Sequence, residues 1–132
     1  MSGASLFDAV RRQAGSQVTT VPLARETLIH LMHTLEQLVL DRKLASLVCA
    51  GLGFGDGWES TTRQLEKLAG PAAYILAFGE RTAPLADLPG VTPIPVAAGD
   101  PLSGERFFLV LSYTFSALLC AAGSALLYWW VN

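Results

Sequence analysis

Residues 107–131 read FFLVLSYTFSALLCAAGSALLYWWV, a stretch without a formal charge whose interpretation decides the fold. A run of this length could cross a bilayer as one helix, and its terminal Tyr and Trp residues would suit a membrane interface. The punctuation inside the run favours another interpretation, since Ser112–Thr114 is typical of a turn with a helix cap and Gly123 of a stop. We therefore expect a strand over 107–111, a short helix over 115–122 and a strand over 125–131.

The chain upstream of this stretch carries further strand signals. A turn at 99–101 suits the entry into a strand that covers 106–111. The segment 91–96 (VTPIPV) alternates, and its two prolines indicate an edge strand or an extended segment. Two apolar runs, 45–50 and 72–78, do not alternate, which is typical of strands covered on both faces.

Three segments have the pattern of helices. The clearest begins near Pro22 and ends near Arg42 or Lys43, with an apolar stripe at helical spacing. That stripe comprises Leu28, Leu31, Met32, Leu35, Leu38 and Val39. A short helix is expected over 4–14 and another over 59–68, the latter ahead of Gly70-Pro71.

These elements predict an α/β fold in a single domain. We expect a central mixed sheet of about five strands flanked by helices, in the order α-α-β-α-β-β-β-α-β. Residues 1–21 form an N-terminal helix and connector, and residues 22–132 form the domain proper. The AVILMFWYC set makes up 52% of the 132 residues and charged residues 15%, which excludes a disordered chain.

Charge and cysteine content limit the partners and the compartment. The net charge is −2, and the basic residues are scattered, so we expect no nucleic-acid binding. Cys49 and Cys120 lie in apolar runs without a second metal ligand nearby, which favours buried free thiols and a cytoplasmic location. The apolar content exceeds what one core needs, so we expect a homodimer that uses the first two helices or the edge Tyr128–Val131.

A glycine-rich stretch, Gly51–Gly57, follows the first buried strand. It departs from the dinucleotide-binding fingerprint because Asp56 stands where a glycine is needed, and no Lys-Ser/Thr pair follows for a P-loop. If the two buried strands are parallel neighbours, Phe54, Asp56 and Trp58 would meet Phe78 beyond their carboxyl ends. This cluster would take a small apolar or cationic ligand; the alternative is that these aromatics only close the end of the core.

Glu36 lies at the edge of the apolar stripe of the long helix, where it would contact a ligand or tie down a neighbouring backbone. His30 and His33 lie on the far side of that helix, where a polar surface or an oligomer contact explains them more simply than a metal site. No catalytic triad, Cys-His pair or paired carboxylates stand out. We therefore expect no catalytic residues and no metal, and the sequence assigns no cofactor.

Several segments together resemble one family. They are LIHLMHTLE (28–36), the dipeptide Leu68-Ala69, AYILAFG (73–79), IPVAAGDPLSGERFFLVLS (94–112) and YTFSALLCA (113–121). In this order they are similar to the DICT sensory domain, over roughly residues 22–122. The acidic position of the family's opening helix matches Glu36.

The resemblance implies a bacterial signal-input module without an activity of its own, found beside kinases or diguanylate cyclases. On this basis we expect a non-enzymatic module that couples ligand or partner binding to an output protein. Two alternatives stay open: a small-ligand-binding or enzymatic α/β domain of another lineage, and a membrane protein anchored by residues 107–131.

Overall fold

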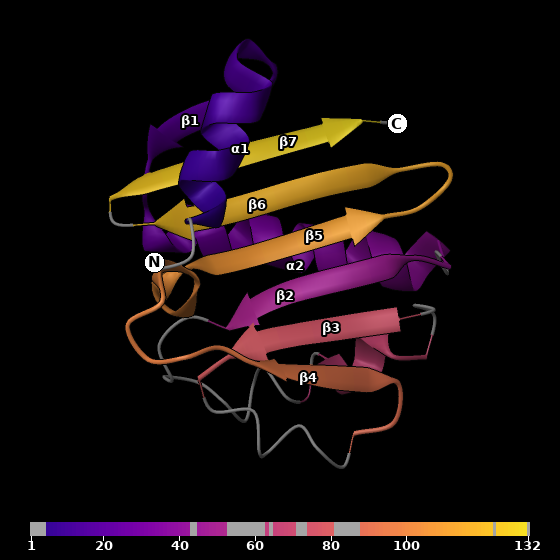
Figure 1. Cartoon of the computed structure of the whole chain (residues 1–132). Coiled ribbons are helices and arrows are strands. Elements are labelled where there is room, and N and C mark those ends of the chain that lie inside the picture. The colour runs from indigo at the N-terminus through magenta and orange to yellow at the C-terminus, as the bar shows by residue number, and fades with distance from the viewer. Residues whose placement is uncertain are drawn as a thin grey trace.

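The computed structural model describes residues 5–42, 45–52, 63, 65–70, 74–80, 88–122 and 124–131. These residues form two α-helices, two 3-10 helices and seven strands, besides a short helical stretch at 65–68 (Figure 1). In chain order they are α1 (Leu6–Ala14), η1 (Gly15–Gln17), β1 (Thr19–Pro22), α2 (Arg25–Arg42), β2 (Leu47–Leu52), β3 (Tyr74–Gly79), β4 (Val91–Pro95), η3 (Pro101–Gly104), β5 (Arg106–Leu111), β6 (Ser116–Ala122) and β7 (Ala125–Val131).

All seven strands belong to one mixed sheet, in the order β1-β7-β6-β5-β2-β3-β4. The strands β2, β3 and β4 are parallel neighbours, and every other pair is antiparallel. The mixed sheet, the central place of β2 and the edge position of β4 are confirmed. Of the helix expected over 59–68, Arg63 and residues 65–68 are helical and the others lie outside the described residues.

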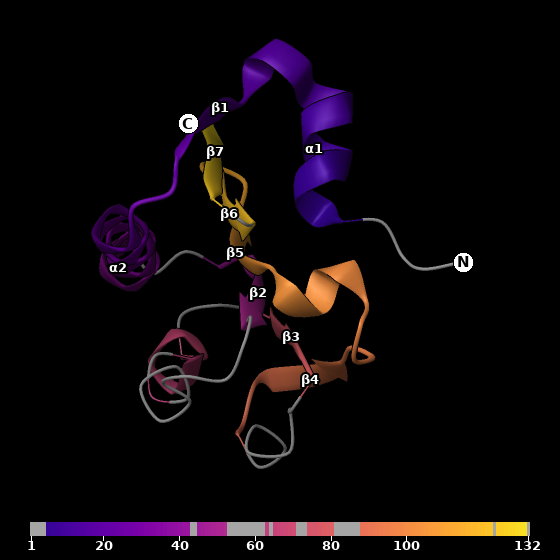
Figure 2. The same ribbon diagram turned by 90° about the vertical axis from the view of Figure 1, so that its left-hand side faces the viewer.

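Helices cover both faces of the sheet. Seen edge-on, α2 and the helical residues 65–68 lie on one face, and α1 and η3 lie on the other (Figure 2). Side chains alternate accordingly along each strand. In β6, for example, Ala117, Leu119 and Ala121 join the clusters on the α2 face, whereas Leu118 and Cys120 join the cluster on the α1 face.

The helix expected over 115–122 is wrong, because this segment is strand β6. Its run SALLCAA lacks alternation since β6 is buried on both faces, so small and apolar residues occur at every position. Ser112 forms a hairpin turn instead of a helix cap: its N–H donates to the carbonyl of Phe115 (3.0 Å), and its hydroxyl accepts from the N–H of Phe115 (3.0 Å). Pairing with β5 and β7 on both sides overrides the helical preference of Ala and Leu.

The expected count of about five strands is also wrong, because β1 and β6 are additional strands. β1 lies where a polar connector and the first turn of the long helix were expected, so α2 begins at Arg25. This four-residue strand pairs with β7, from Thr19 opposite Tyr128 to Pro22 opposite Ala125. A proline is acceptable there because β1 is an edge strand. The strand β1 is too short and too exposed for its sequence to show the alternation typical of a strand.

The segment 107–131 thus forms β5, β6 and β7, and not one long helix. Within the described part of the chain, no helix has both the length and the apolar character needed to cross a membrane.

Gly51 belongs to β2 and not to the loop predicted to begin there. It lies opposite Phe107 on β5, and a Cβ atom at this position would come within 2.2 Å of the Phe107 ring. That ring also packs against Phe78, with 5.7 Å between the ring centroids, so it has little room to move. The absence of a side chain at Gly51 is therefore what allows Phe107 to fold onto the sheet.

We expect Gly51→Ala to lower the free energy of unfolding by about 1–3 kcal/mol, because the new methyl group overlaps a buried ring. Denaturant unfolding of the variant measures this loss. The double variant Gly51→Ala/Phe107→Leu should be less destabilised than the two single costs combined, since the smaller side chain relieves the overlap. Additive losses would contradict the proposed contact.

Candidate functional site

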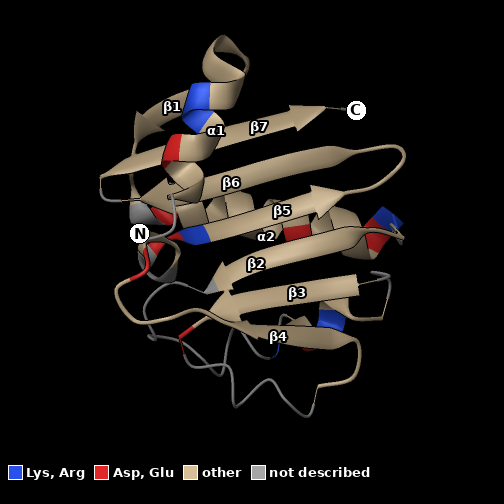
Figure 3. Cartoon of the chain, in the orientation of Figure 1, with Lys and Arg blue, Asp and Glu red and all other residues tan. Residues whose placement is uncertain are grey.

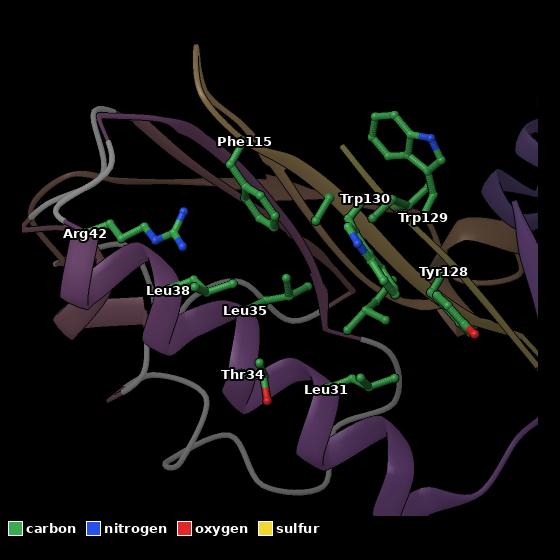
Figure 4. Close-up of a pocket in the computed structure, with 12 residues that line it drawn as sticks. Leu31, Thr34, Leu35, Leu38, Arg42, Phe115, Tyr128, Trp129 and Trp130 are labelled. Atoms are coloured by element: carbon green, nitrogen blue, oxygen red, sulfur yellow. The ribbon is translucent and has the colours of Figure 1, made fainter. Parts of the chain in front are cut away.

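An apolar groove of about 260 Å³ runs between α2 and the sheet, over β6 and β7 (Figure 4). Its lining residues come from α2, from the turn before β6 and from the two strands. They are Leu31, Thr34, Leu35, Leu38, Arg42, Phe115, Ala117, Leu118, Leu119, Tyr128, Trp129 and Trp130. The groove is open to solvent along one side, and so could admit a ligand without unfolding.

The helical wall of the groove follows from the spacing of leucines on α2. Leu31, Leu35 and Leu38 recur at i, i+4 and i+7, which places them on one face of the helix. All three are only half-buried, because they pack against the core from above and leave part of their surface to the groove. Thr34 lies at the solvent rim, and its hydroxyl donates to the carbonyl of His30 (2.9 Å).

The opposite wall is built by the sheet. Ala117 lies across from Trp130, and Leu119 lies across from Tyr128, in the antiparallel register of β6 and β7. Because Tyr128 and Trp130 are two residues apart on β7, both rings project on the α2 face, where they stack with 5.4 Å between centroids and 11° between planes. The Trp129 side chain points away from the groove (Figure 4) and packs in the cluster on the α1 face.

Arg42 is the one charged residue among the groove-lining residues. It closes the end of the groove near Phe115, and its guanidinium points toward the sheet (Figure 4). Charged residues are sparse on the sheet itself, as Figure 3 shows. Asp41, the residue before Arg42 on α2, accepts a hydrogen bond from the Gln37 amide (2.9 Å). Arg42 makes no ion pair with any described residue, so its charge faces the groove and the solvent.

The site predicted around the glycine-rich loop stays a prediction, because most of its residues lie outside the described part of the chain. The strands β2 and β3 are parallel neighbours, as that prediction required. Phe54, Asp56 and Trp58 lie outside the described residues. Phe78 packs against Phe107 in the cluster on the α1 face, so it lies on the opposite side of the sheet from the groove.

Glu36 is buried on α2, next to the groove but outside its lining. Burial raises the pKa of the Glu36 carboxyl, and the charges of His33 and Lys67 partly oppose this rise. The influence of Lys67 places the carboxyl near the helical residues 65–68, and the predicted ligand contact of Glu36 stays a prediction. His30 and His33 are exposed, and the described residues include no group of three or more His, Cys, Asp or Glu side chains that could hold a metal ion.

The raised pKa of Glu36 gives a pH prediction. Because the folded state holds the Glu36 proton more tightly than the unfolded state, its stability should fall as the pH rises above the ordinary carboxyl value of 4.5. Glu36→Gln removes this titration, so the variant should gain stability relative to the wild type between pH 4 and pH 7. Urea unfolding at both pH values measures the difference. The prediction is contradicted if the free energy of unfolding of Glu36→Gln minus that of the wild type stays constant or falls from pH 4 to pH 7.

The two cysteines take no part in the groove. Cys49 and Cys120 are free thiols on the α1 face. Burial, together with the charge of Glu105, raises the pKa of the Cys120 thiol to about 12, and burial also raises the pKa of Cys49. Neither thiol is therefore suited to act as a nucleophile near neutral pH.

Sequence reasoning identified the long helix and the strand over 125–131, but it recognised neither β6 nor the groove that these elements enclose. The leucine stripe was interpreted as core alone, and Tyr128–Val131 as an edge. The signal that would have found the groove is the pair Tyr128 and Trp130, whose i, i+2 spacing in a strand puts two large aromatics on one face. Because 115–122 was expected to be a helix, that face had no assigned neighbour.

Two comparisons with known proteins bear on this arrangement. In a solved structure, the polyphosphate kinase from Porphyromonas gingivalis, a similar fold matches 96% of this chain with a TM-score of 0.50 and 12% sequence identity. The chain spans only 23% of that protein, so the likeness concerns the fold alone. Residues 4–123 match the family model of DICT, described as a sensory domain in diguanylate cyclases and two-component systems. Since this match covers nearly the whole chain, the chain belongs to the DICT family of sensory domains.

Proposed function

We propose that this chain is a non-enzymatic signal-input module that binds a small molecule in the α2–β7 groove and relays its presence to an output protein. The observation that carries the proposal is the groove itself, an open apolar space between a helix and a sheet that are otherwise closely packed. Small-molecule sites are concave and mostly apolar, with few polar groups for orientation. The family is a sensory one, which gives such a site the role of detecting a ligand and not of catalysing a reaction.

The strand β7 offers a path from the groove to a partner. Tyr128 and Trp130 line the groove, while the outer edge of β7 is covered by β1 only as far as Tyr128. Beyond that point Trp130 and Val131 are 57% and 50% exposed. A ligand that moves the Trp130 ring would therefore act on the strand whose edge is free to pair with another chain.

A second copy of the chain is the first partner to consider for that edge, and we propose a homodimer through the end of β7. Pairing of Trp130 and Val131 with their counterparts would extend the sheet across the dimer. We expect light scattering to give the dimer mass and Val131→Lys, which places a charge at this edge, to shift it toward the monomer. A monomer mass for the wild type at micromolar concentration would contradict the dimer and would leave an output protein as the partner for this edge.

We also propose a cytoplasmic location beside an output protein such as a histidine kinase or a diguanylate cyclase. The two free thiols Cys49 and Cys120 fit a reducing compartment. The family occurs in proteins of both classes.

Retention of small molecules by the purified chain tests the proposal. The chain is equilibrated with a protein-free metabolite extract of its producing cells, separated from unbound material and measured by native mass spectrometry. We expect the wild type to retain at least one small molecule with unchanged mass. Thr34→Phe, which puts a ring at the exposed rim of the groove, should lose it, whereas Gln37→Phe should keep it because Gln37 does not line the groove.

Two results would contradict the proposed function. One is equal retention by the wild type and Thr34→Phe, which would place any bound molecule outside the groove. The other is conversion of the retained molecule to a product of different mass, which would make the chain an enzyme. Melting curves of both Phe variants verify that each is folded.

A further inference from the structure

We propose that the groove takes an unbranched acyl carboxylate of about ten to twelve carbons, with the acyl chain along α2 and the carboxylate on Arg42. This inference rests on the proposed function, because it names the class of molecule that the same groove would bind. It draws on three observations: the length of the groove, the chemistry of its lining and the place of its one cation.

The groove is elongated along the helix. Its lining extends along α2 from Leu31, beside Tyr128, to Arg42, near Phe115 (Figure 4). Eleven residues of helix advance about 16 Å at about 1.5 Å each. An extended carbon chain with bonds of about 1.5 Å and angles near 111° advances about 1.25 Å per bond, so ten to twelve carbons span most of this length. A compact ring system would leave one end of the groove empty.

The lining selects a saturated chain over a polar molecule. Leucines, an alanine and the faces of three aromatic rings make up almost all of the surface between the two ends. The Thr34 hydroxyl already donates to the His30 carbonyl, which leaves the Tyr128 hydroxyl and the Trp130 indole N–H as the other neutral polar side-chain groups of the lining. A sugar, a nucleotide or a peptide backbone would therefore lose more hydrogen bonds to water than these two groups can replace, which disfavours all three.

The cation at one end selects the head group. Arg42 has no ion pair with any described residue, and its guanidinium is aimed at the end of the groove near Phe115. A guanidinium binds a carboxylate through two parallel hydrogen bonds, whereas it gives a neutral alcohol only one uncharged acceptor. Apolar lining along the length, and at the end one cation without an ion pair among the described residues, together match a molecule that is apolar except for one anionic end.

Calorimetric titration with decanoate, hexanoate and 1-decanol tests this assignment on the wild-type chain. Decanoate should bind saturably, in a one-to-one ratio, and more tightly than hexanoate by at least about tenfold, because the longer chain buries four more methylene groups. It should also bind more tightly than 1-decanol by about tenfold, the usual worth of one partly exposed charged contact. Thr34→Phe should abolish the binding of all three.

A matched pair of charge variants locates the carboxylate. Arg42→Gln should weaken decanoate binding by about tenfold and leave 1-decanol binding unchanged. Arg11→Gln is the control, since it removes the same charge from an exposed position on α1, on the opposite face of the sheet. Thermal unfolding of both variants ensures that a loss of affinity is not a loss of fold.

Several results would overturn the inference. They are the absence of saturable decanoate binding, equal affinity for decanoate and 1-decanol, and equal weakening by Arg42→Gln and Arg11→Gln. If decanoate fails while the wild type still retains a metabolite that Thr34→Phe loses, the sensory function stands and only the ligand class is wrong. If neither decanoate nor any metabolite depends on the groove, both proposals fail.

Discussion

Replacement of Phe108 by Ala is expected to lower the free energy of unfolding by about 3–5 kcal/mol. Phe108 is 2% exposed and is the largest fully buried side chain of the described residues. It lies on β5, at the centre of the sheet, in the core cluster under α2 and the helical residues 65–68. The loss is large because removal of the ring leaves a cavity between packed elements that cannot close over it, in a domain whose whole stability is about 5–15 kcal/mol.

Tyr113→Ala is the matched control for this prediction. Tyr113 is an aromatic residue only five positions away, but it is fully exposed in the turn before β6. Its removal should change the stability by less than about 0.5 kcal/mol. Urea unfolding of both variants measures the contrast, and similar losses for the two would show that Phe108 does not occupy the core.

Removal of the Glu105 carboxylate is expected to release α1 from the sheet, at a cost of about 2–4 kcal/mol. The Glu105 side chain is buried and accepts from the N–H groups of Leu6 (2.9 Å) and Phe7 (3.3 Å) as well as from the Ser5 hydroxyl. These are donors at the N-terminus of α1, which the helix cannot satisfy itself. In Glu105→Ala they lose a charged acceptor in a buried place, which costs about 1–3 kcal/mol for each unsatisfied group.

Hydrogen exchange distinguishes this local effect from general destabilisation. In Glu105→Ala the amides of α1 should exchange much faster, while those of α2 on the other face keep their protection, because α1 can detach without exposing the α2 cluster. Glu105→Gln, which keeps an acceptor oxygen, should lie between the wild type and Glu105→Ala. Glu66→Ala, at an exposed helical position, should leave α1 unchanged. Equal exchange in α1 and α2 would contradict a local role.

Periodicity predicted those elements whose sequence pattern reflects their own burial. The long helix was recognised because its apolar stripe faces one sheet, and β4 because its prolines exclude a central position. The strand β6 was mistaken for a helix because a strand buried on both faces has no alternation, and Ala and Leu suit either structure. Only its pairing with β5 and β7 makes this segment a strand, and such long-range contacts cannot be recognised from a short window of sequence.

The candidate site could be predicted still less well, for a related reason. A groove is the space between two walls, and here the walls are α2 and the pair β6 and β7, which lie about ninety residues apart in the chain. The residue types on each wall are ordinary core residues. Arg42 was expected only near the end of the long helix, where a basic residue suits the helix dipole, and nothing local distinguishes that position from a place at the end of a groove. The correct choice required the register that puts Trp130 opposite Ala117.

The most direct test of the groove as the sensory site is a methyl NMR spectrum of the chain before and after addition of the metabolite extract. If the proposal is correct, shifts will concentrate on the methyl groups of Leu31, Leu35, Leu38 and Leu119, which face the groove, and those of Leu102 and Leu127 on the α1 face will stay in place. A spectrum that does not change, or one that changes on the α1 face alone, would contradict the central claim that this domain receives its signal between α2 and β7.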